Sequence, residues 1–269
     1  MSKKNNRLKK IISIVKDNNG ASVKDLSSTL DVSEMTIRRD IKLLEDKNIV
    51  ESYYGSVVYN HNLDNPIIGP NSDNKNTIEY NLNLNSLLMD DEKSAIGKKA
   101  AELIKEDDVV IIDVGTTTEK LSQYINELTS FTALIFSCNN LLHLMNKPKV
   151  NLIMAGGNFH KDTGMFESKE ALSIIDTVRA RKVFLSAAGV HDKLGVTCAN
   201  PYEIETKKHI MKNSLEIILL IDSSKFGTVK SSHFCDLNQI DTIITDCKIS
   251  DEWKNIIDSN NIKLIIADK

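Results

Sequence analysis

The sequence contains few cysteines and no histidine pattern of the kind that binds metal. Its four cysteines lie far apart and form no C-x-x-C pair. This spacing favours neither a zinc site nor a disulfide framework, and we interpret the cysteines as ordinary buried thiols. The six histidines show no H-E-x-x-H or similar ligand spacing. We therefore expect no metal and no cofactor.

Long apolar runs are absent as well. Runs such as VVII at 109–112 and IILLI at 217–221 are far shorter than the roughly 18 residues that a membrane-spanning helix needs. The basic N-terminus MSKKNNRLKK is followed by a periodic polar and apolar segment, and a signal peptide would have a continuous apolar region there. These features predict a cytoplasmic protein without a membrane partner.

What is present is an ordinary globular composition with an uneven distribution of charge. Hydrophobic residues make up 41% of the 269 residues, which excludes disorder as the overall state. Residues 1–60 carry 11 Lys and Arg against 8 Asp and Glu, whereas the remainder carries 23 against 29. A small basic unit joined to a larger acidic one is typical of a nucleic-acid reader attached to a second function.

An asparagine-rich segment divides the chain. Residues 61–85 include Pro66 and Pro70 and keep neither a helical nor a strand periodicity for long. This segment is the predicted linker. It separates a domain at 1–60 from a domain at 86–269.

Residues 1–60 have the pattern of three helices followed by a hairpin. The apolar residues of the first helix share one face and are Leu8, Ile11, Ile12 and Val15. Ser22 and Ser33 are candidate N-caps of two further helices, VKDLSSTL and SEMTIRRDIKLLEDK, which are joined by the short turn DVS. Two short strands are expected around IVESYYGSVVY, with a turn near Gly55. This order is typical of a winged helix-turn-helix domain of the α+β class.

The third predicted helix has an apolar face and a cationic face. Apolar residues recur at i, i+4 and i+7 from Ile37, while Arg38, Arg39 and Lys42 lie mostly on the other side. Guanidinium groups there can meet guanine O6 and N7 or phosphates, and Thr36 lies near the exposed start of the helix. The alternative is that the arginines only pair with nearby acidic residues, namely Glu34, Asp40 or Glu45.

From residue 86 onward the pattern alternates between helices and apolar strands. Apolar runs such as VVIID, FTALIFS, KVFLSAAG and LEIILLID follow helical segments such as EKSAIGKKAAELIKE and PYEIETKKHIMKN. Strands that are apolar on both faces and alternate with helices indicate a parallel sheet covered by helices on each side. The predicted class of this domain is α/β.

The residues directly after the apolar runs are polar or small, and ligands of α/β folds bind beyond the carboxyl ends of the strands. In DVGTTT at 113–118, Gly115 allows close backbone approach, and a helix expected to begin near Thr118 directs its positive end at the same place. Together with the threonine hydroxyls and amides this predicts a phosphate cradle, with Lys225 as a candidate countercharge. The alternatives are a helix cap at GTTT, a plain turn at residues 156–157 and a solvated Lys225.

The sequence resembles the DeoR family of bacterial repressors. SEMTIRRD at 33–40 and the YYGS turn are similar to the family's N-terminal signature, although Tyr54, Gly55 and Ser56 stand where the family usually has a basic or aromatic residue followed by Gly-Gly. The resemblance implies that the third helix reads DNA. The residues expected to contact operator DNA are Ser33, Thr36, Arg38, Arg39 and Lys42.

The resemblance continues in the second domain through DVGTTT, AGG, GVT and DSSKFG. It implies a sensor domain that has a fold related to sugar-phosphate isomerases and binds phosphorylated sugars. SAAGVH at 186–191, VKSS at 229–232 and ITDC at 244–247 look closest to a family member that responds to deoxyribose 5-phosphate. The effector site implied by the resemblance includes Asp113, Gly115, Thr116, Thr117, Asn139, Gly157, Lys207 and Lys225.

An enzyme is an alternative, because the implied fold includes isomerases. Isomerisation through an enediol needs a carboxylate base close to C1 and C2 of the sugar. Ribose-phosphate isomerases place an acidic residue in the stretch equivalent to SAAG, where this chain has Ala188. Asp113 and Glu203 are the remaining candidates for a base. We therefore expect no catalysis and no catalytic residue.

Ala188 also leads to a hypothesis about the ligand. A small apolar side chain in place of a hydroxyl-binding carboxylate suits a sugar that lacks a hydroxyl there, as deoxyribose 5-phosphate does. A buried carboxylate left unpaired beside a methylene would cost roughly 1–3 kcal/mol. The alternative is that Ala188 simply packs against a neighbouring strand.

Together these features predict a transcriptional repressor of a carbohydrate or deoxyribonucleoside catabolic operon. The expected partners are operator DNA and a phosphorylated sugar that releases the repressor, with deoxyribose 5-phosphate as the first candidate. A homo-oligomer is expected because operators tend to mirror the twofold symmetry of the protein. The alternatives are an isomerase-like enzyme, a repressor that senses a different sugar phosphate, and an adaptor that binds no DNA.

Overall fold

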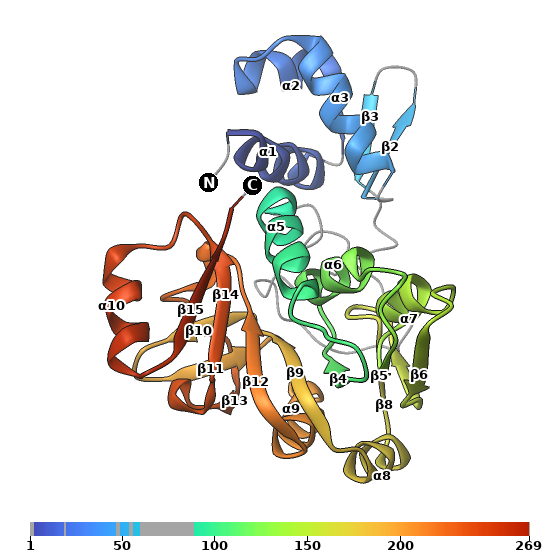
Figure 1. The fold of residues 1–269 in the computed structure, drawn as a ribbon. Coiled ribbons are helices and arrows are strands. Elements are labelled where there is room, and N and C mark those ends of the chain that lie inside the picture. Colours follow the sequence, from blue (N-terminus) through green and yellow to red (C-terminus); the bar gives the residue numbers. More distant parts are fainter. Residues whose placement is uncertain (1–2, 19, 47–48, 54–55, 60–88, 269) are drawn as a thin grey trace. The chain divides into compact units, whose positions relative to one another are not determined.

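The chain divides into two compact units, Met1–Met89 and Asp90–Lys269. A computed structural model describes residues 3–18, 20–46, 49–53, 56–59 and 89–268 (Figure 1). The predicted linker at 61–85 and the predicted turn at Gly55 lie outside the described residues. Among the residues that are described, no helix is long and apolar enough to cross a membrane.

The first unit is a winged helix-turn-helix domain, as predicted. Its elements are α1 (Lys3–Asp17), β1 (Ala21–Ser22), α2 (Val23–Leu30), α3 (Glu34–Glu45), β2 (Val50–Tyr53) and β3 (Ser56–Tyr59). The strands pair antiparallel in the order β1-β3-β2. The two-residue strand β1, which the sequence pattern did not predict, extends the predicted hairpin by a third strand.

Local signals in the sequence account for the ends of α2 and α3. The Ser22 hydroxyl accepts a hydrogen bond from the Asp25 amide at 3.0 Å, and the Ser33 hydroxyl accepts one from the Thr36 amide at 3.3 Å. Both serines therefore act as N-caps, as predicted. Asp31 ends α2 in the left-handed conformation with φ 51°, which turns the chain sharply toward α3. The core beneath these helices includes Leu8, Ile11, Val15, Leu26, Ile37, Ile41, Leu44 and Val57.

The second unit is built on a parallel sheet of seven strands in the order β15-β14-β12-β9-β4-β5-β6. These strands are β4 (Val109–Ile112), β5 (Phe131–Ile135), β6 (Val150–Met154), β9 (Ala180–Ser186), β12 (Ser214–Leu220), β14 (Thr242–Asp246) and β15 (Lys263–Ala267). Its helices are α5 (Asp90–Ala101), α6 (Thr116–Tyr124), α7 (Cys138–Leu144), α8 (Lys169–Thr177), α9 (Glu203–Lys212) and α10 (Asp251–Ser259). The α/β class is confirmed.

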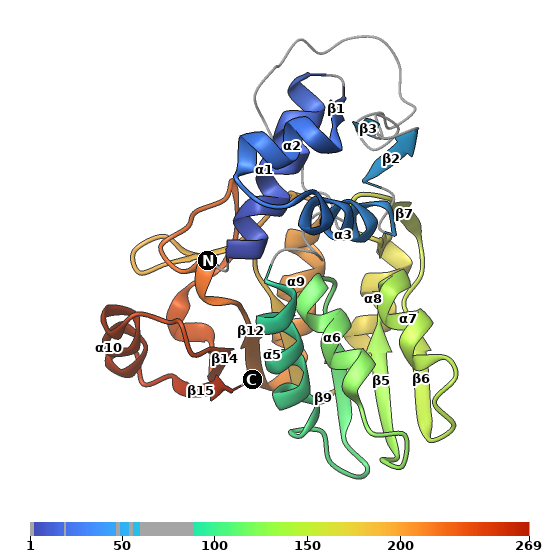
Figure 2. The same ribbon diagram turned by 90° about the horizontal axis from the view of Figure 1, so that it is seen from above.

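Both faces of the sheet are buried, because alternate residues of each strand enter two separate cores. Val110 and Ile112 of β4 pack with Ile96 of α5 on one face. Ile111, between them, packs with Ile210 of α9 on the other face. Figure 2 shows α5, α6 and α7 on the first face and α8 and α9 on the second. Burial on both faces is why these strands read as continuous apolar runs.

Short antiparallel elements are added to this framework and were missed in the sequence. A three-stranded sheet consists of β10 (Gly189–His191), β11 (Gly195–Cys198) and β13 (Ser232–Cys235). A separate hairpin pairs β7 (Asn158–His160) with β8 (Met165–Glu167). Strands of three or four residues are too short to show a period of two, so the sequence carries no clear signal for them.

The interpretation of all four cysteines as buried thiols is wrong for two of them. Cys198 and Cys235 lie on strands of the small sheet and are buried. Cys138 begins α7 and is half-buried, and Cys247 follows the end of β14 and is exposed. Positions just beyond a strand face the rim of the sheet, where neighbouring elements do not cover every side chain.

Candidate functional site

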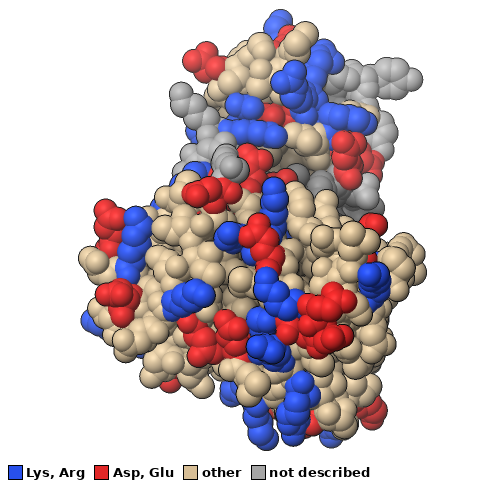
Figure 3. Space-filling model, viewed as in Figure 1, with Lys and Arg blue, Asp and Glu red and all other residues tan. Residues whose placement is uncertain are grey.

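The exposed face of α3 carries the cationic residues that the sequence predicts there. Arg38, Arg39 and Lys42 are exposed, whereas Ile37 and Ile41 on the opposite side are buried. Figure 3 shows Lys and Arg side chains on the visible surface of this unit, with Asp and Glu among them. The helix thus presents guanidinium groups to solvent from its first two turns.

The alternative is that the arginines only pair with nearby acidic residues. Of the two arginines, Arg38 alone forms such a pair among the described residues. Arg38 Nη2 lies 3.4 Å from Glu34 Oε2, but both side chains are largely exposed, and such pairs contribute little. Lys42 has a similar exposed contact of 3.4 Å with Asp46. Arg39 has no ion pair with any described residue. Arg38 and Lys42 can therefore exchange their carboxylate partners for a DNA phosphate at a small cost in free energy.

Asp40, the second of the three acidic candidates, belongs to a different contact. Its side chain is 2% exposed and accepts hydrogen bonds from Arg7 Nε at 2.5 Å and from Arg7 Nη2 at 3.3 Å. The pair ties α1 to the buried side of α3. The sequence suggested no role for Arg7, because its partner lies 33 residues away.

Ser33 and Thr36, predicted to contact DNA, lie together at the start of α3. Their hydroxyl oxygens are 2.9 Å apart, and Ser33 also caps the helix. Both residues lie at the N-terminal end of the helix that carries the arginines. The structure therefore brings all five predicted DNA-contacting residues onto one helix and its cap.

In the second unit, the loop after β4 leads directly into α6. The helix begins at Thr116, two residues before the predicted start near Thr118, because Gly115 takes the N-cap position with φ 151°. A Cβ atom at Gly115 would lie 2.8 Å from both Cβ and Oγ of Ser186. Glycine is therefore required both by the backbone conformation and by the close approach to β9. The amides of the first turn of α6 point to the carboxyl edge of the sheet.

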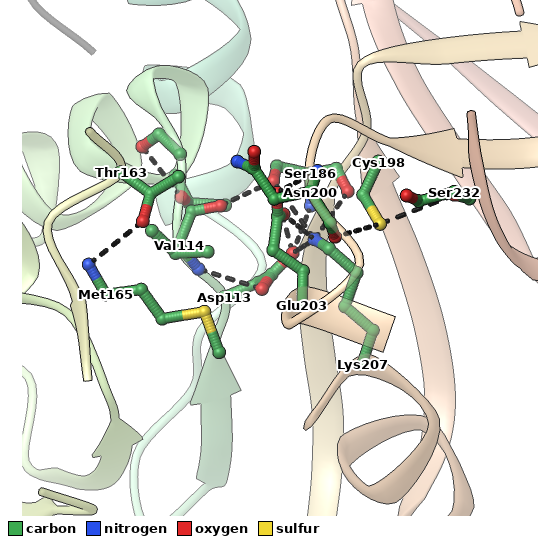
Figure 4. A network of polar contacts seen from close by, with 12 residues as sticks. Asp113, Val114, Thr163, Met165, Ser186, Cys198, Asn200, Glu203, Lys207 and Ser232 are labelled. Atoms are coloured by element: carbon green, nitrogen blue, oxygen red, sulfur yellow. Dashed lines mark hydrogen bonds and ion pairs between the residues drawn. The ribbon is translucent and has the colours of Figure 1, made fainter. Parts of the chain in front are cut away.

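Asp113 and Lys207, both predicted to contact the effector, form a buried ion pair with one another (Figure 4). Asp113 also accepts hydrogen bonds from the Val114 amide at 2.8 Å and the Ser186 amide at 2.9 Å. Lys207 donates to the Ser186 carbonyl at 3.1 Å. Burial opposes the charged form of Lys207, but the adjacent carboxylates outweigh it and raise the pKa of Lys207. The pair joins β4, β9 and α9 beneath the DVGTTT loop.

Glu203, a candidate base in the enzymatic alternative, lies on the same helix as Lys207. Its carboxylate is 3.6 Å from Lys207 Nζ and accepts a hydrogen bond from the Asn200 amide at 3.1 Å. Burial raises the pKa of Glu203 despite the nearby ammonium group. Cys198, on β11 beside this network, has its pKa raised by burial to about 12, which makes it an unreactive thiol.

The other predicted effector residues follow neighbouring strands along the same edge. Thr116 and Thr117 form the first turn of α6 and are 6% exposed each. Asn139 follows β5 and donates a hydrogen bond to Glu119 Oε2 at 3.0 Å. Gly157 follows β6 with φ 149° and is exposed, and a Cβ atom there would collide with the backbone at the end of β8. Strand order thus brings these segments to one edge.

Lys225 lies in the short 3-10 turn Ser223–Lys225, directly after β12. Asp222 starts this turn by accepting a hydrogen bond from the Ser224 amide at 3.1 Å. The following segment is held by the Gly227 amide, which donates to the Val190 carbonyl at 2.8 Å. Strand β10, missed in the sequence, therefore supports the loop that carries Lys225.

Lys93 is a buried lysine of the second unit that the sequence analysis did not predict to be functional. It lies on α5, is 2% exposed, and occurs one turn before Gly97, where α5 packs against the backbone of Lys120 in α6. Burial lowers the pKa of Lys93 to about 7; the charge of Asp222 opposes this shift, and that of Lys225 adds to it. Lys93 thus lies on the same side of α5 as Gly97, the side that packs against α6, one turn nearer the start of α5. A lysine on the apolar face of a helix is the signal that could have found it.

Ala188 follows β9 and is 8% exposed, and its amide donates to the Thr197 carbonyl at 2.8 Å. Its backbone thus belongs to the connection between β9 and β10. Burial beside β11 is what the plainer of the two interpretations of Ala188 expects, in which the residue packs against a neighbouring strand.

Two family models match this chain. The DeoR-like helix-turn-helix domain matches residues 7–62, and the DeoR C terminal sensor domain matches residues 89–247. The chain therefore belongs to the DeoR family and is a DNA-binding transcriptional regulator with a C-terminal sensor domain.

Curated relatives align along nearly the whole chain. The Deoxyribose operon repressor of Escherichia coli (strain K12) is 30% identical over 98% of this chain and 99% of its own length. The HTH-type transcriptional regulator GolR of Listeria innocua is 29% identical over 91% of each chain. The HTH-type transcriptional regulator IolR of Bacillus subtilis is 28% identical over 91% of this chain and 92% of its own. All three carry the names of regulators.

Among solved structures, the ribose 5-phosphate isomerase A of Methanocaldococcus jannaschii matches with 16% identity and a TM-score of 0.38, over 51% of this chain and 55% of that chain. The eIF2B beta of Chaetomium thermophilum matches with 16% identity and a TM-score of 0.43, over 60% of this chain and 51% of that chain.

Proposed function

We propose that this chain represses a carbohydrate or deoxyribonucleoside catabolic operon in the cytoplasm and leaves its operator when a phosphorylated sugar binds the second unit. The observation that carries the effector half of this proposal is Lys93, a buried lysine on the side of α5 that packs against α6 at Gly97. Burial of an ammonium group has a cost, because the charge has been removed from water. A dianionic phosphate nearby would add to the compensation that the contacts of Lys93 inside the protein already provide.

The phosphate would be held by two backbone amides and two lysines at the carboxyl edge of the sheet. The amides of Thr116 and Thr117 supply donors at the positive end of α6, and Lys93 and Lys225 supply charge. In this proposal Asp113 and Lys207 act as positioning residues. Their buried pair holds the loop between β4 and α6 against Ser186, so that the amides keep their direction without any movement on binding.

The proposed sugar is deoxyribose 5-phosphate. Support comes from Ala188 after β9, which offers no carboxylate to a hydroxyl, and from the relative in Escherichia coli that is named for the deoxyribose operon. Release from DNA requires that the sugar bind more tightly to the form of the protein that does not bind operator. Coupling of this kind commonly amounts to about 1–3 kcal/mol. A homo-oligomer is part of the proposal, because helix-turn-helix operators are usually twofold symmetric.

The DNA half is tested with operator duplexes selected by the full-length chain from a random pool. We expect Arg38→Ala and Arg39→Ala each to weaken operator binding by about 1–3 kcal/mol while the protein remains folded. The affinity of the unmodified chain should fall steeply with salt concentration, because phosphate contacts release counterions. Lys254→Ala, in an exposed pair on α10, is the control and should change nothing. Salt-insensitive binding would favour the adaptor alternative.

The effector half is tested by fluorescence anisotropy of the same duplex with deoxyribose 5-phosphate or ribose 5-phosphate. We expect the deoxy sugar to release the DNA at concentrations at which ribose 5-phosphate does not. Ala188→Asp should weaken the response to the deoxy sugar by about 1–3 kcal/mol, because a carboxylate would then lie near a methylene. Release by ribose 5-phosphate alone would reject the proposed sugar, and release by neither would reject sugar control at this site.

A further inference from the structure

Met35 stands out on the surface of the first unit. Its side chain is 73% exposed, and among the described residues of this unit it is the one large hydrophobic side chain with high exposure. The other apolar residues of α3, Ile37, Ile41 and Leu44, are buried. A single exposed apolar side chain is ordinary on a protein surface, so what distinguishes Met35 is its place on α3.

Met35 lies on the same side of α3 as the cationic residues. Met35, Arg38, Arg39 and Lys42 follow the spacing i, i+3, i+4 and i+7, which places them on one stripe of the helix. All four are exposed. Met35 occupies the first turn, just after the Ser33 cap. In helix-turn-helix proteins the N-terminal residues of the recognition helix approach the base edges most closely.

The chemistry of the major groove offers one apolar group on the base edges, the C5-methyl group of thymine. The arginines on the same stripe as Met35 can serve guanine or phosphate, but they cannot replace a contact with a methyl group. We propose that Met35 reads the methyl group of a thymine in the operator half-site and is therefore a specificity-determining residue. This inference rests on the proposed DNA-binding function and adds to it the kind of base that α3 selects.

The test replaces each thymine of a selected operator duplex by uracil, one position at a time, which removes only the methyl group. The full-length chain is compared with Met35→Gln, which is similar in size but polar, and with Met35→Leu, which remains apolar. Leu215→Gln is the matched control, because Leu215 is 86% exposed on β12 of the second unit. Circular dichroism shows whether each variant keeps its helix content.

We expect uracil at one or two positions to weaken binding of the unmodified chain by about fourfold, the value of one buried methyl group. Met35→Gln should bind the unmodified operator less well by a similar factor and should no longer distinguish thymine from uracil at those positions. Met35→Leu and Leu215→Gln should keep the distinction.

Two results would overturn the inference while leaving the DNA-binding proposal intact. In the first, the operator is bound with salt-sensitive affinity but no single methyl group matters. In the second, Met35→Gln keeps the same dependence on the methyl group, so that another side chain reads it. A chain that selects no duplex from the pool contradicts the proposed function itself, which is a different outcome.

Discussion

At the scale of the residue, Lys93 and Lys182 show two ways in which a lysine is buried in this molecule. Lys182 is 8% exposed, and its ammonium group lies 2.6 Å from the Asp108 carboxylate. Lys93 is 2% exposed, and the pKa lowered to about 7 indicates that its surroundings compensate only part of the cost of burial. Buried charged residues that lower the stability of a protein are often functional, because the same charge that destabilises the fold is needed to bind a ligand.

We predict that Lys93→Met makes the second unit more stable but less responsive to its effector. At pH 6 the free energy of unfolding should rise by about 1–3 kcal/mol, because the variant no longer buries a charge. The folded pKa of Lys93 is about 7 and the unfolded value is 10.5, so the unmodified protein gains stability as the pH rises between these values. The advantage of the variant should therefore shrink toward pH 10, as measured by denaturant unfolding.

Lys182→Met is the control for this prediction. It removes the partner of a buried carboxylate, so it should lower stability at pH 6 by about 1–3 kcal/mol. If Lys93→Met were equally destabilising at pH 6, the contacts of Lys93 within the folded unit would outweigh the cost of burying its charge, and Lys93 would not mark an anion site.

At the scale of the element, the site depends on where helices begin and how closely they pack. Gly97 lets α5 approach the backbone of Lys120 in α6, since a Cβ atom there would lie 2.6 Å from it. Lys93, one turn before Gly97 on the same side of α5, is thereby held on the side that packs against α6. The sequence predicted both helices, but it placed the start of α6 near Thr118 because a threonine run carries no marker for its first helical residue. The backbone angle of Gly115 decides that start.

The element α3 combines two functions on opposite sides. Its buried side carries Ile37 and Ile41 together with Asp40, which binds Arg7 of α1. Its exposed side carries the arginines and Met35. Helical periodicity made the division between these sides predictable, because a residue's place on the helix follows from its number alone. The partner of Asp40 was not predictable in this way, since α1 could have packed in several registers.

At the scale of the whole molecule, the two units have separate hydrophobic cores. The core residues of the first unit form one cluster, and the two clusters of the second unit lie on either face of its sheet. Because each unit can bury its own apolar surface, we expect each to unfold in its own cooperative transition. An effector that binds the second unit then raises the stability of that unit directly.

We predict that Asp40→Asn shifts only the transition of the first unit. Loss of the charge that binds Arg7 should lower its stability by about 1–3 kcal/mol and leave the second transition unchanged. Asp46→Asn, which affects an exposed pair with Lys42, should change stability by less than about 0.5 kcal/mol. Calorimetry of the full chain measures both transitions. A shift of both by Asp40→Asn would show that the units unfold as one.

The sequence by itself determined the order of the helices and of the strands of the seven-stranded sheet, the cationic side of α3 and the polar residues that follow those strands. Those features depend on neighbours a few residues away, and the periods of helix and strand make them readable. Only the tertiary structure decided that Asp113 pairs with Lys207, 94 residues away, and that Lys93 is buried on the side of α5 that packs against α6. Such contacts depend on how side chains fill a closed interior, which local periodicity does not specify.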